Sequence, residues 1–424
     1  MVSRRVLVIA TIVAALTVAA PAGAAPPAVS GQLIVGFEKQ ASQDRQGRIL
    51  AALGGRVAKR LGAIRGGRLA VVRPRSGNAT GALLKRLRGA SGVAYAEPDY
   101  YQFSSRTPND PFYPRDWALV DGPEAHDIDA PSAWDARTSC AKVAILDTGI
   151  DTDHPDLAEN VYKSSDKPNN NKDDDKNGFV DDTYGFDVIA GKGSGEDDNG
   201  HGTHVSGIVG ARGNNGVGIA GTCWSTKLVA VKFMNSRGKG STSNAIAGIE
   251  YAVKQGIKVI NCSFGSDAKS SSLKDAVDYA KSKGALLVVA AGNDSEDIDK
   301  TPIYPASYSE SNILTVAATT DTDELASFSN FGTSAVDVAS PGDEIFSTYL
   351  GGGYKVLDGT SMASPYVAGV AALLRKQEPD ASYGDLRNAI RHNVDNPPAL
   401  AGKVADSGRL NAAKALVAIP SLVD

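Results

Sequence analysis

Four polar residues of this chain have the types and positions needed for acyl transfer. Asp147 directly follows the apolar run VAIL, and Asn293 closes LLVVAAGN. His201 and Ser361 each stand at the start of a helix-like segment. A serine hydroxyl becomes a nucleophile when a base takes its proton, a carboxylate holds that base in the correct tautomer, and a donor stabilises the oxyanion. These roles would fall to Ser361, His201, Asp147 and the Asn293 amide, with the Ser361 N–H as a second donor.

Each of these residues has a simpler interpretation when it is considered alone. Asp147 could cap a helix and His201 could be a buried core histidine. Asn293 could form an Asx turn, and Ser361 could be an N-cap. His204, three residues after His201, is a rival for the role of base. The combination of residue types favours the catalytic interpretation.

The segments that carry these residues predict a parallel α/β sheet. Short apolar, β-branched runs start at residues 142, 227, 258, 285 and 313, and they alternate with helical patterns such as TSNAIAGIEYAVKQG and SLKDAVDYAKSKG. Continuous apolar strands separated by helices indicate a sheet that is covered on both faces. In such sheets ligands bind beyond the carboxyl ends of the strands, where Asp147 and Asn293 would stand.

Composition and charge divide the chain in two. With 424 residues, 42% of them hydrophobic and 22% charged, the chain is typical of a globular protein and not of a disordered or fibrous one. Residues 26–105 hold 13 basic and 4 acidic side chains, a net charge of +9, whereas the residues after 105 carry a net charge of −15. A basic segment could bind nucleic acid or anionic lipid, but the acidic remainder of the same chain is present at a far higher effective concentration. We therefore expect the two parts to associate, with no nucleic acid partner.

The first residues predict a secretory signal peptide over 1–25. The stretch MVSRR is positively charged, residues 6–20 are apolar, and small residues stand at Ala22 and Ala24. The alternative is an uncleaved anchor, but the apolar run is short of the ~20 residues that span a bilayer. We expect a secreted, extracellular protein with no membrane association once the signal is removed.

Residues 26–105 predict a small α+β domain. Its expected strands are QLIVGF, RLAVVRP and VAYAEPDYYQF, and its expected helices are GRILAALGG and GALLKRLRGA. From SSRTPNDP at residue 104 the composition indicates an exposed linker. The large domain would then span residues 106–424.

Four blocks resemble the signatures of the subtilisin-like serine peptidases, the subtilases. These blocks are VAILDTGID, NGHGTHVSG, VVAAGN and DGTSMASPYVAG, in this order. TPNDPFYPRDWAL, HPDL, GNNGVGIAGT, YPASY and FSNFGTSAVDVASPG are most similar to the thermitase-like group, and residues 31–103 resemble the family's inhibitory propeptide. The resemblance, which covers about residues 107–413, implies a three-layer α/β subtilisin-like fold with a mostly parallel sheet. It also implies a small α+β ferredoxin-like propeptide domain in front.

The resemblance assigns roles to the four residues. It makes Asp147, His201 and Ser361 the catalytic triad and Asn293 the oxyanion donor, and it chooses His201 over His204 as the base. It implies a secreted, monomeric serine endopeptidase that hydrolyses protein or peptide substrates through an acyl-enzyme. The enzyme would be a self-processing zymogen whose propeptide is an intramolecular chaperone and inhibitor. The alternative is a non-catalytic binding or inhibitory protein on the same scaffold, although no triad member is missing.

Substrate contacts also follow from the resemblance. The stretch CSFG matches the edge strand against which a substrate backbone pairs. The residues expected to line the specificity pocket are Ser263, Phe264, Gly265, Ala291 and Gly292. Ile303 stands where the family has a residue near the pocket floor, so we expect a shallower pocket than in relatives with Gly there.

Two calcium sites are predicted. In residues 173–182, the loop positions 1, 3, 5 and 9 of an EF-hand hold Asp173, Asp175, Asn177 and Asp181, with Gly178 at position 6. Position 12 is Tyr184, so a ligand from elsewhere is required, and a solvated acidic loop is the alternative. The resemblance implies the second site, at Asp110, Asp156 and Asn214 or Asn215. Hard oxygen ligands favour structural Ca²⁺ over zinc.

Three cysteines predict one disulfide and one free thiol in an exported protein. In the family, the strand after Cys223 lies beside the strand after Cys140, which implies a Cys140–Cys223 disulfide. Cys262 lies within an apolar run and is expected to be a buried thiol.

Two short motifs are misleading. GVGIAG fits G-x-G-x-x-G, but it follows a helix and precedes a strand, which is the reverse of a dinucleotide site, so nucleotide binding is excluded. GTSMA is close to the G-x-S-x-G elbow of α/β-hydrolases, in which the serine precedes the acid and the histidine. Here the serine comes last.

Overall fold

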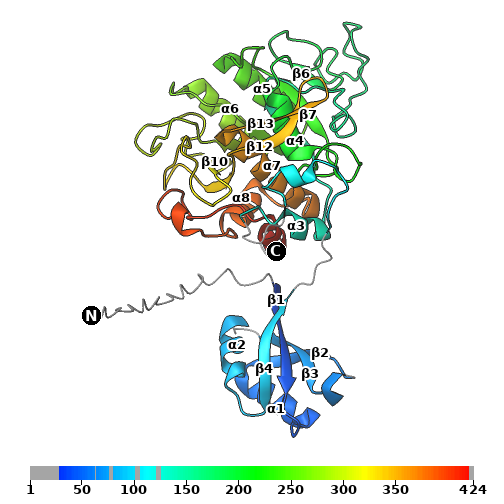
Figure 1. The fold of residues 1–424 in the computed structure, drawn as a ribbon, viewed down its shortest axis with the longest axis vertical. Helices are drawn as coiled ribbons and strands as arrows, with labels where there is room; N and C mark the ends of the chain where they lie inside the picture. Colours follow the sequence, from blue (N-terminus) through cyan, green and yellow to red (C-terminus); the bar gives the residue numbers. More distant parts are fainter. Residues whose placement is uncertain (1–27, 63, 76–79, 101–105, 121–125, 420–424) are drawn as a thin grey trace, which may run out of the picture.

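The computed structural model describes residues 28–62, 64–75, 80–100, 106–120 and 126–419, which form two domains, each with its own sheet and core (Figure 1). The predicted signal peptide lies outside the described residues. Within these ranges, no helix has the length and apolar character required to cross a membrane.

The N-terminal domain has the βαββαβ order of a ferredoxin-like fold. Its elements are β1 (Ala28–Phe37), α1 (Gln43–Leu53), β2 (Gly55–Arg60), η1 (Ile64–Gly66), β3 (Leu69–Pro74), α2 (Thr80–Arg88) and β4 (Val93–Tyr100). The strands pair antiparallel in the order β2-β3-β1-β4. The helices bury Leu50, Leu83 and Leu87 against the sheet. The predicted ferredoxin-like propeptide fold is confirmed.

The sequence did not predict strand β2. Its residues GRVAKR carry three basic side chains, and apolar and polar residues do not alternate regularly along them. β2 lies at the sheet edge, where it pairs with β3 alone, so it needs only a weak apolar pattern.

A seven-stranded parallel sheet forms the centre of the C-terminal domain. Its strands are β5 (Val143–Asp147), β6 (Gly185–Asp187), β7 (Leu228–Lys232), β8 (Val259–Cys262), β9 (Leu286–Ala290), β10 (Ile313–Thr319) and β11 (Val338–Pro341). They are ordered β11-β10-β9-β8-β5-β7-β6, and the neighbours pair in parallel. All five predicted runs form strands. The two edge strands were not predicted, because β6 has only three residues and β11 ends in a proline.

Helices cover both faces of this sheet, as predicted. The helical elements are η2 (Tyr113–Arg115), α3 (Ala130–Ala136), α4 (His201–Gly210), α5 (Thr242–Lys254), α6 (Ser271–Ser282), α7 (Thr360–Gln377), α8 (Tyr383–Arg391), η3 (Pro398–Leu400) and α9 (Ala412–Ala418), and a hairpin is formed by β12 (Ile345–Tyr349) and β13 (Gly353–Leu357). Ile145 of β5 packs with α4 and α7, whereas its neighbour Leu146 packs with α5 and α6, which lie side by side in Figure 1. The result is a three-layer α/β fold.

The chain reverses its direction of winding at β5. After β5 the chain places β6 and β7 on one side of it and then β8 on the other side, so the carboxyl ends of β5 and β8 meet at a topological switch point. Ligands of open α/β sheets bind in the crevice that forms there. Asp147 ends β5, and Ser263 directly follows β8.

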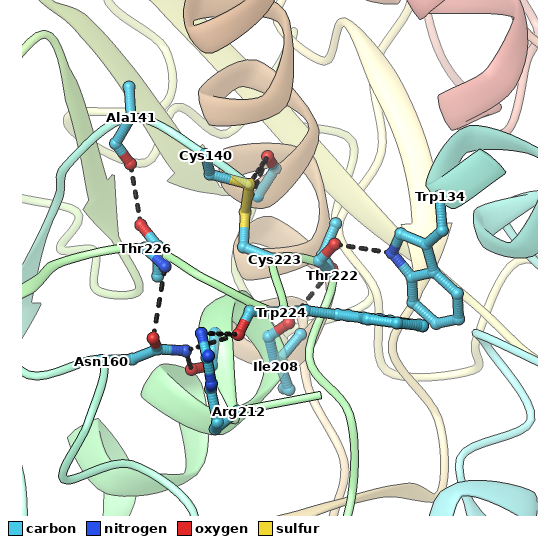
Figure 2. The surroundings of a disulfide bond; sticks show 12 residues. Trp134, Cys140, Ala141, Asn160, Ile208, Arg212, Thr222, Cys223, Trp224 and Thr226 are labelled. Atoms are coloured by element: carbon cyan, nitrogen blue, oxygen red, sulfur yellow. Dashed lines mark hydrogen bonds between the residues drawn. A yellow bond between two sulfur atoms is a disulfide. The ribbon is translucent and has the colours of Figure 1, made fainter. Parts of the chain in front are cut away.

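The amino ends of β5 and β7 are joined by the predicted disulfide between Cys140 and Cys223 (Figure 2). The Cys223 sulfur contacts the Gly369 carbonyl of α7, and a Cβ on Gly369 would lie 2.6 Å from the Thr222 Cβ. The segment with Thr222 and Cys223, which leads into β7, therefore packs closely against α7. Cys262 is the buried free thiol that the sequence predicted, and burial raises the pKa of this thiol.

Candidate active site

Asp147 and His201 are joined by a direct hydrogen bond. The His201 Nδ1 lies 2.8 Å from the Asp147 Oδ1, which also accepts the Thr148 N–H at 2.7 Å. Asp147 is fully buried at the end of β5, and the His201 side chain, on the first residue of α4, is 26% exposed. Because Oδ1 of a carboxylate can only accept, Nδ1 carries the proton, and Nε2 is left with its lone pair. The helix-cap interpretation of Asp147 is wrong.

Glycines allow α4 to approach the end of β5. A Cβ on Gly202 would lie 2.2 Å from the Gly149 carbonyl oxygen and 3.2 Å from the Asp147 Cβ. The Gly202 N–H donates to the Thr148 hydroxyl at 2.9 Å, which fixes the helix start against the strand. A glycine directly after His201 is thus needed to bring the start of α4, and with it His201, to Asp147.

The charge state of His201 depends on two opposing effects. Burial disfavours the imidazolium, but the Asp147 carboxylate, with a smaller contribution from Asp197, outweighs it and raises the pKa of His201 above its ordinary value. The imidazole is therefore a stronger base than a free histidine.

Ser361 lies at the second position of α7, at the same edge of the sheet. Gly359 is the helix N-cap, so the interpretation of Ser361 as an N-cap is wrong. The Ser361 Oγ donates to the Ser263 carbonyl oxygen at 3.3 Å, which fixes the start of α7 to the residue after β8. Among the described residues, no hydrogen bond joins Ser361 Oγ to His201, so the structure joins Asp147 to His201 directly and Ser361 to the neighbouring strand end.

Asn293 presents its amide nitrogen beside Ser361. Its Oδ1 accepts the backbone N–H of Thr360 at 2.9 Å and the Thr360 hydroxyl at 2.8 Å, which fixes the orientation of the amide because a backbone N–H can only donate. A Cβ on Gly359 would lie 3.3 Å from Asn293 Nδ2 and 3.6 Å from the Ser361 nitrogen. Two N–H donors therefore stand next to the same small glycine.

Comparisons with known proteins identify the family. Residues 139–412 match the Subtilase family, and residues 16–99 match the Fervidolysin N-terminal prodomain. The chain is 42% identical to thermitase from Thermoactinomyces vulgaris over 311 residues, which cover 73% of this chain and 99% of the relative. This chain is a subtilase. It is therefore a serine endopeptidase with an N-terminal prodomain, as the four sequence blocks predicted.

Two further proteases are similar to this subtilase in sequence or in structure. A thermophilic serine proteinase from Bacillus sp. strain AK1 is 36% identical over 397 residues, which cover 92% of this chain and 88% of the relative. Among solved structures, a protease from Pseudoalteromonas arctica matches with a TM-score of 0.63 at 29% identity, covering 74% of this chain and 100% of that chain. The thermitase-like group predicted from the sequence agrees with these matches.

His204 lies one helical turn along α4 from Gly200, and its side chain bonds to the β12–β13 hairpin. Its Nε2 lies 3.1 Å from the Ile345 carbonyl oxygen and 3.0 Å from the Lys355 carbonyl oxygen, which it reaches across the β12–β13 hairpin. Burial lowers the pKa of His204 to about 3, so the ring is neutral and fixes the hairpin to α4. The His204 side chain thus contacts backbone carbonyl groups, whereas the His201 side chain contacts the Asp147 carboxylate.

A cavity of about 500 Å³ opens beside Ser361 and Asn293. Of the predicted substrate residues, Phe264, Gly265, Gly292 and Ile303 line this cavity. Ser263 and Ala291 do not. Ser263 is buried, with its hydroxyl 3.0 Å from both the Ser361 carbonyl oxygen and the Ser364 hydroxyl, and Ala291 is buried in the core.

Ile303 packs against the cavity wall. Its Cγ2 would lie only 2.8 Å from a Cβ on Gly265. We predict that Ile303→Gly raises kcat/KM for large aromatic P1 side chains relative to P1 Ala by at least about tenfold, because removing a branched side chain deepens an apolar pocket. P1 denotes the residue before the scissile bond. The measurement compares kcat/KM for peptide p-nitroanilides with Phe, Tyr and Ala at P1, and no gain for Phe and Tyr would contradict the shallow pocket.

A second cavity of about 360 Å³ shares the segment 264–266 and is lined in part by Phe233, Leu273 and Tyr304. Ser266 at the end of this segment pairs with Tyr304 through backbone bonds of 2.9 and 2.7 Å. Phe264, Gly265 and Ser266 line both cavities.

Four predicted metal ligands come together near the start of the domain. The Asp110 carboxylate accepts the N–H groups of Asn214 and Asn215 at 2.6 and 3.1 Å. The Asp156 Oδ1 accepts the Asn215 amide at 2.9 Å. Burial raises the pKa of Asp156 to about 6, and the charge of Asp110 adds to this effect. Two buried carboxylates therefore lie near each other, and both are linked to the segment 214–215.

The acidic loop also folds into a cluster, with one change from the predicted ligands. Asp166, Asp173 and Asp175 each offer an oxygen within 4.8 Å of the others. Asn177 donates its N–H to Asp173 and Asp175, both at 3.1 Å. Asp181, in contrast, does not face this cluster, because its two oxygens accept the N–H groups of Asn170 and Asn171 at 2.9 and 3.0 Å.

The EF-hand spacing did not predict Asp166, which lies seven residues before Asp173 in the sequence. Its oxygens accept the N–H groups of Asp175 and Asp182 at 2.9 and 3.3 Å, so the incoming chain folds back over the loop. Asp182 is fully buried beside it, and its Oδ1 has no partner among the described residues. Burial raises the pKa of Asp182 to about 7.

Proposed function

We propose that this subtilase is a secreted serine endopeptidase in which Ser361, His201 and Asp147 act as a triad and form an acyl-enzyme. The observation that carries the proposal is the 2.8 Å bond between His201 Nδ1 and Asp147 Oδ1, at the strand-end edge where Ser361 begins α7. This bond leaves Nε2 as the free base, on a ring whose pKa is raised.

The mechanism follows from these groups. The Ser361 Oγ attacks the carbonyl carbon of the peptide while His201 Nε2 takes the hydroxyl proton. Asp147 stabilises the imidazolium that forms, and His201 returns the proton to the leaving amine. Water then attacks the acyl-enzyme by the same route, which releases the second product and restores the Ser361 hydroxyl.

Two donors are proposed for the oxyanion. The Asn293 Nδ2 is held by the bonds of its Oδ1 to Thr360, so it does not need to reorganise when charge develops. The Ser361 N–H belongs to the first turn of α7, where backbone donors have no partner within the helix.

One observation favours the alternative of a non-catalytic protein on this scaffold. The Ser361 Oγ donates to the Ser263 carbonyl and not to His201. Hydrogen bonds of catalytic groups are often long or misaligned before substrate binds, and rotation about χ1 moves Oγ between staggered positions. The complete set of Asp147, His201, Ser361 and Asn293 supports the peptidase.

Incubation of the purified protein with casein tests the two functions. The peptidase should degrade casein, and a serine-directed inhibitor that acylates or phosphonylates Ser361 should abolish the degradation. Sequencing of the new N-terminus would locate the maturation site. Casein that stays intact, together with an unmodified Ser361, would support the non-catalytic alternative.

The zymogen proposal rests on the prodomain match and on charge. Residues 26–105 carry a net charge of +9 and the residues after 105 a net charge of −15, which favours a complex between prodomain and enzyme. The prodomain would assist folding, block the cleft until it is cut near residues 103–107, and leave a monomeric mature enzyme that acts on protein or peptide substrates. Export would follow from the signal peptide proposed for residues 1–25.

Calcium is the cofactor that fits both oxygen-rich clusters. Oxygens within 4.8 Å of one another can surround an ion that binds its ligands at about 2.3–2.6 Å. The buried Asp182 Oδ1, which has no partner among the described residues, is a further oxygen beside the loop cluster. Asp166, Asp173 and Asp175 would hold one ion, and Asp110 and Asp156 with Asn214 or Asn215 would hold another. The ions would stabilise the fold by neutralising these carboxylates.

Removal of calcium is expected to lower Tm by about 5–10 °C, the effect of losing one well-saturated site. Differential scanning calorimetry on inhibitor-blocked protein, so that self-digestion does not contribute, would compare EDTA-treated samples with and without added CaCl2. Asp173→Asn should reduce the calcium-dependent rise, whereas Asp174→Asn, in the same loop but outside the cluster, should preserve it. A Tm that does not change on EDTA treatment would contradict the calcium proposal.

A further inference from the structure

The 500 Å³ cavity beside Ser361 has the position of the pocket that receives the P1 side chain. Ser361 and Asn293 stand on one wall, and the exposed segment 264–267 forms another. A peptide carbonyl placed between the Ser361 hydroxyl and the Asn293 amide directs the side chain before it into this space. The chemistry of the lining therefore decides which P1 residues are accepted.

The lining of this cavity is acidic. Asp267, Asp294 and Glu296 belong to it, and it includes no lysine or arginine. Within the described ranges, none of these three carboxylates forms an ion pair. The nearest ammonium groups along the chain are engaged elsewhere, since Lys300 pairs with Asp297 at 2.8 Å and Lys269 lies over the Tyr304 ring.

The carboxylate of Asp294 is held at the wall. Its backbone N–H donates to the Asn330 Oδ1 at 2.9 Å, and its Oδ2 lies 3.5 Å from the Asn330 Nδ2. A Cβ on Gly292 would stand 3.7 Å from this Oδ2. The charge thus borders the glycine that forms the pocket wall, directly after the oxyanion donor Asn293.

Part of the cavity lining is apolar. Ile303 presses on Gly265, and Phe264 lies beside them, so the slot accepts a narrow aliphatic chain more readily than an aromatic ring. Lys and Arg have this shape, because their methylene stems pack on apolar surface while the charged end reaches polar groups. Asp267, Asp294 and Glu296 belong to the same lining and offer carboxylates to that end.

On the basis of the proposed peptidase function, we propose that this subtilase cleaves preferentially after Lys and Arg, and that Asp294 and Glu296 select the positive charge at P1. Asp267 contributes from the segment that follows β8. The three carboxylates are exposed, so the preference is moderate and weakens as salt screens the charges.

Peptide p-nitroanilides that differ only at P1 test the proposal, with Arg against citrulline, which has nearly the same shape and no charge. In wild type at low salt, kcat/KM for Arg should exceed that for citrulline by about five- to tenfold, and the ratio should fall with added NaCl. The double variant Asp294→Asn/Glu296→Gln should bring the ratio close to one. Glu324→Gln, an exposed carboxylate outside the cavity, should keep the wild-type ratio.

The outcomes separate this proposal from the function on which it rests. A wild-type ratio near one with efficient cleavage of both substrates would overturn the charge preference and leave the peptidase intact. A high ratio that survives both the double variant and high salt would also overturn it. Failure to cleave any of the substrates would overturn both proposals together.

Discussion

Ser361→Ala is expected to lower kcat for peptide hydrolysis by about 10⁶. The variant retains the His201–Asp147 pair and the Asn293 amide, but no atom remains that can attack the carbonyl carbon. Residual hydrolysis would come from water and from the oxyanion donors alone. The measurement is kcat with a peptide p-nitroanilide, and it must be made on protein free of contaminating protease. A loss of less than about 10³ would contradict the role of Ser361 as nucleophile.

The same variant should accumulate as uncut precursor, since self-processing needs the same nucleophile. Addition of catalytic amounts of wild-type enzyme should cut the precursor, which would show that its linker is accessible. Ser272→Ala is a matched control, because Ser272 is the second residue of α6 just as Ser361 is the second residue of α7. It should mature and cleave like wild type. A Ser361→Ala protein that matures in isolation would contradict self-processing.

The strands and helices of the C-terminal domain were predictable because burial leaves a strong pattern. β5, β7 and β9 are buried on both faces, so each reads as a continuous apolar run. The edge strands β2 and β6 lack this pattern, since an edge needs little apolar surface. Position in the sheet therefore decided which strands the sequence could reveal.

The site residues were predictable where they directly follow a strand or begin a helix. Asp147 and His201 stand in fixed relation to a strand end and a helix start, so their meeting at one edge follows from the parallel topology. The acidic loop contains no strand end or helix start that would place its ligands. Its ligand Asp166 comes from a segment that folds back, and a positive φ of 58° at Asp181 accompanies the turn of that carboxylate away from the cluster. Spacing in the sequence could not show either feature.

Asp147→Asn is expected to lower kcat by about 10⁴, although an asparagine occupies the same space. The Asp147 Oδ1 accepts both from His201 Nδ1 and from the Thr148 N–H, whereas an asparagine has one accepting atom and one donating group. If the amide NH₂ faces His201, Nδ1 must accept and the proton moves to Nε2, where it blocks the base. The loss of the carboxylate also removes the charge that stabilises the imidazolium.

The pH dependence of this variant distinguishes loss of charge from loss of geometry. Activity needs neutral His201, and Asp147 raises the pKa of that ring, so wild-type kcat/KM should rise through a pKa above about 6.5. Without the carboxylate, burial dominates, the pKa of His201 falls, and the acid limb should move to lower pH. Asp153→Asn removes an exposed carboxylate from the loop after β5 and should leave the limb in place. If the acid limb of Asp147→Asn stays where it is in wild type, Asp147 does not set the basicity of His201, and another group must be the base.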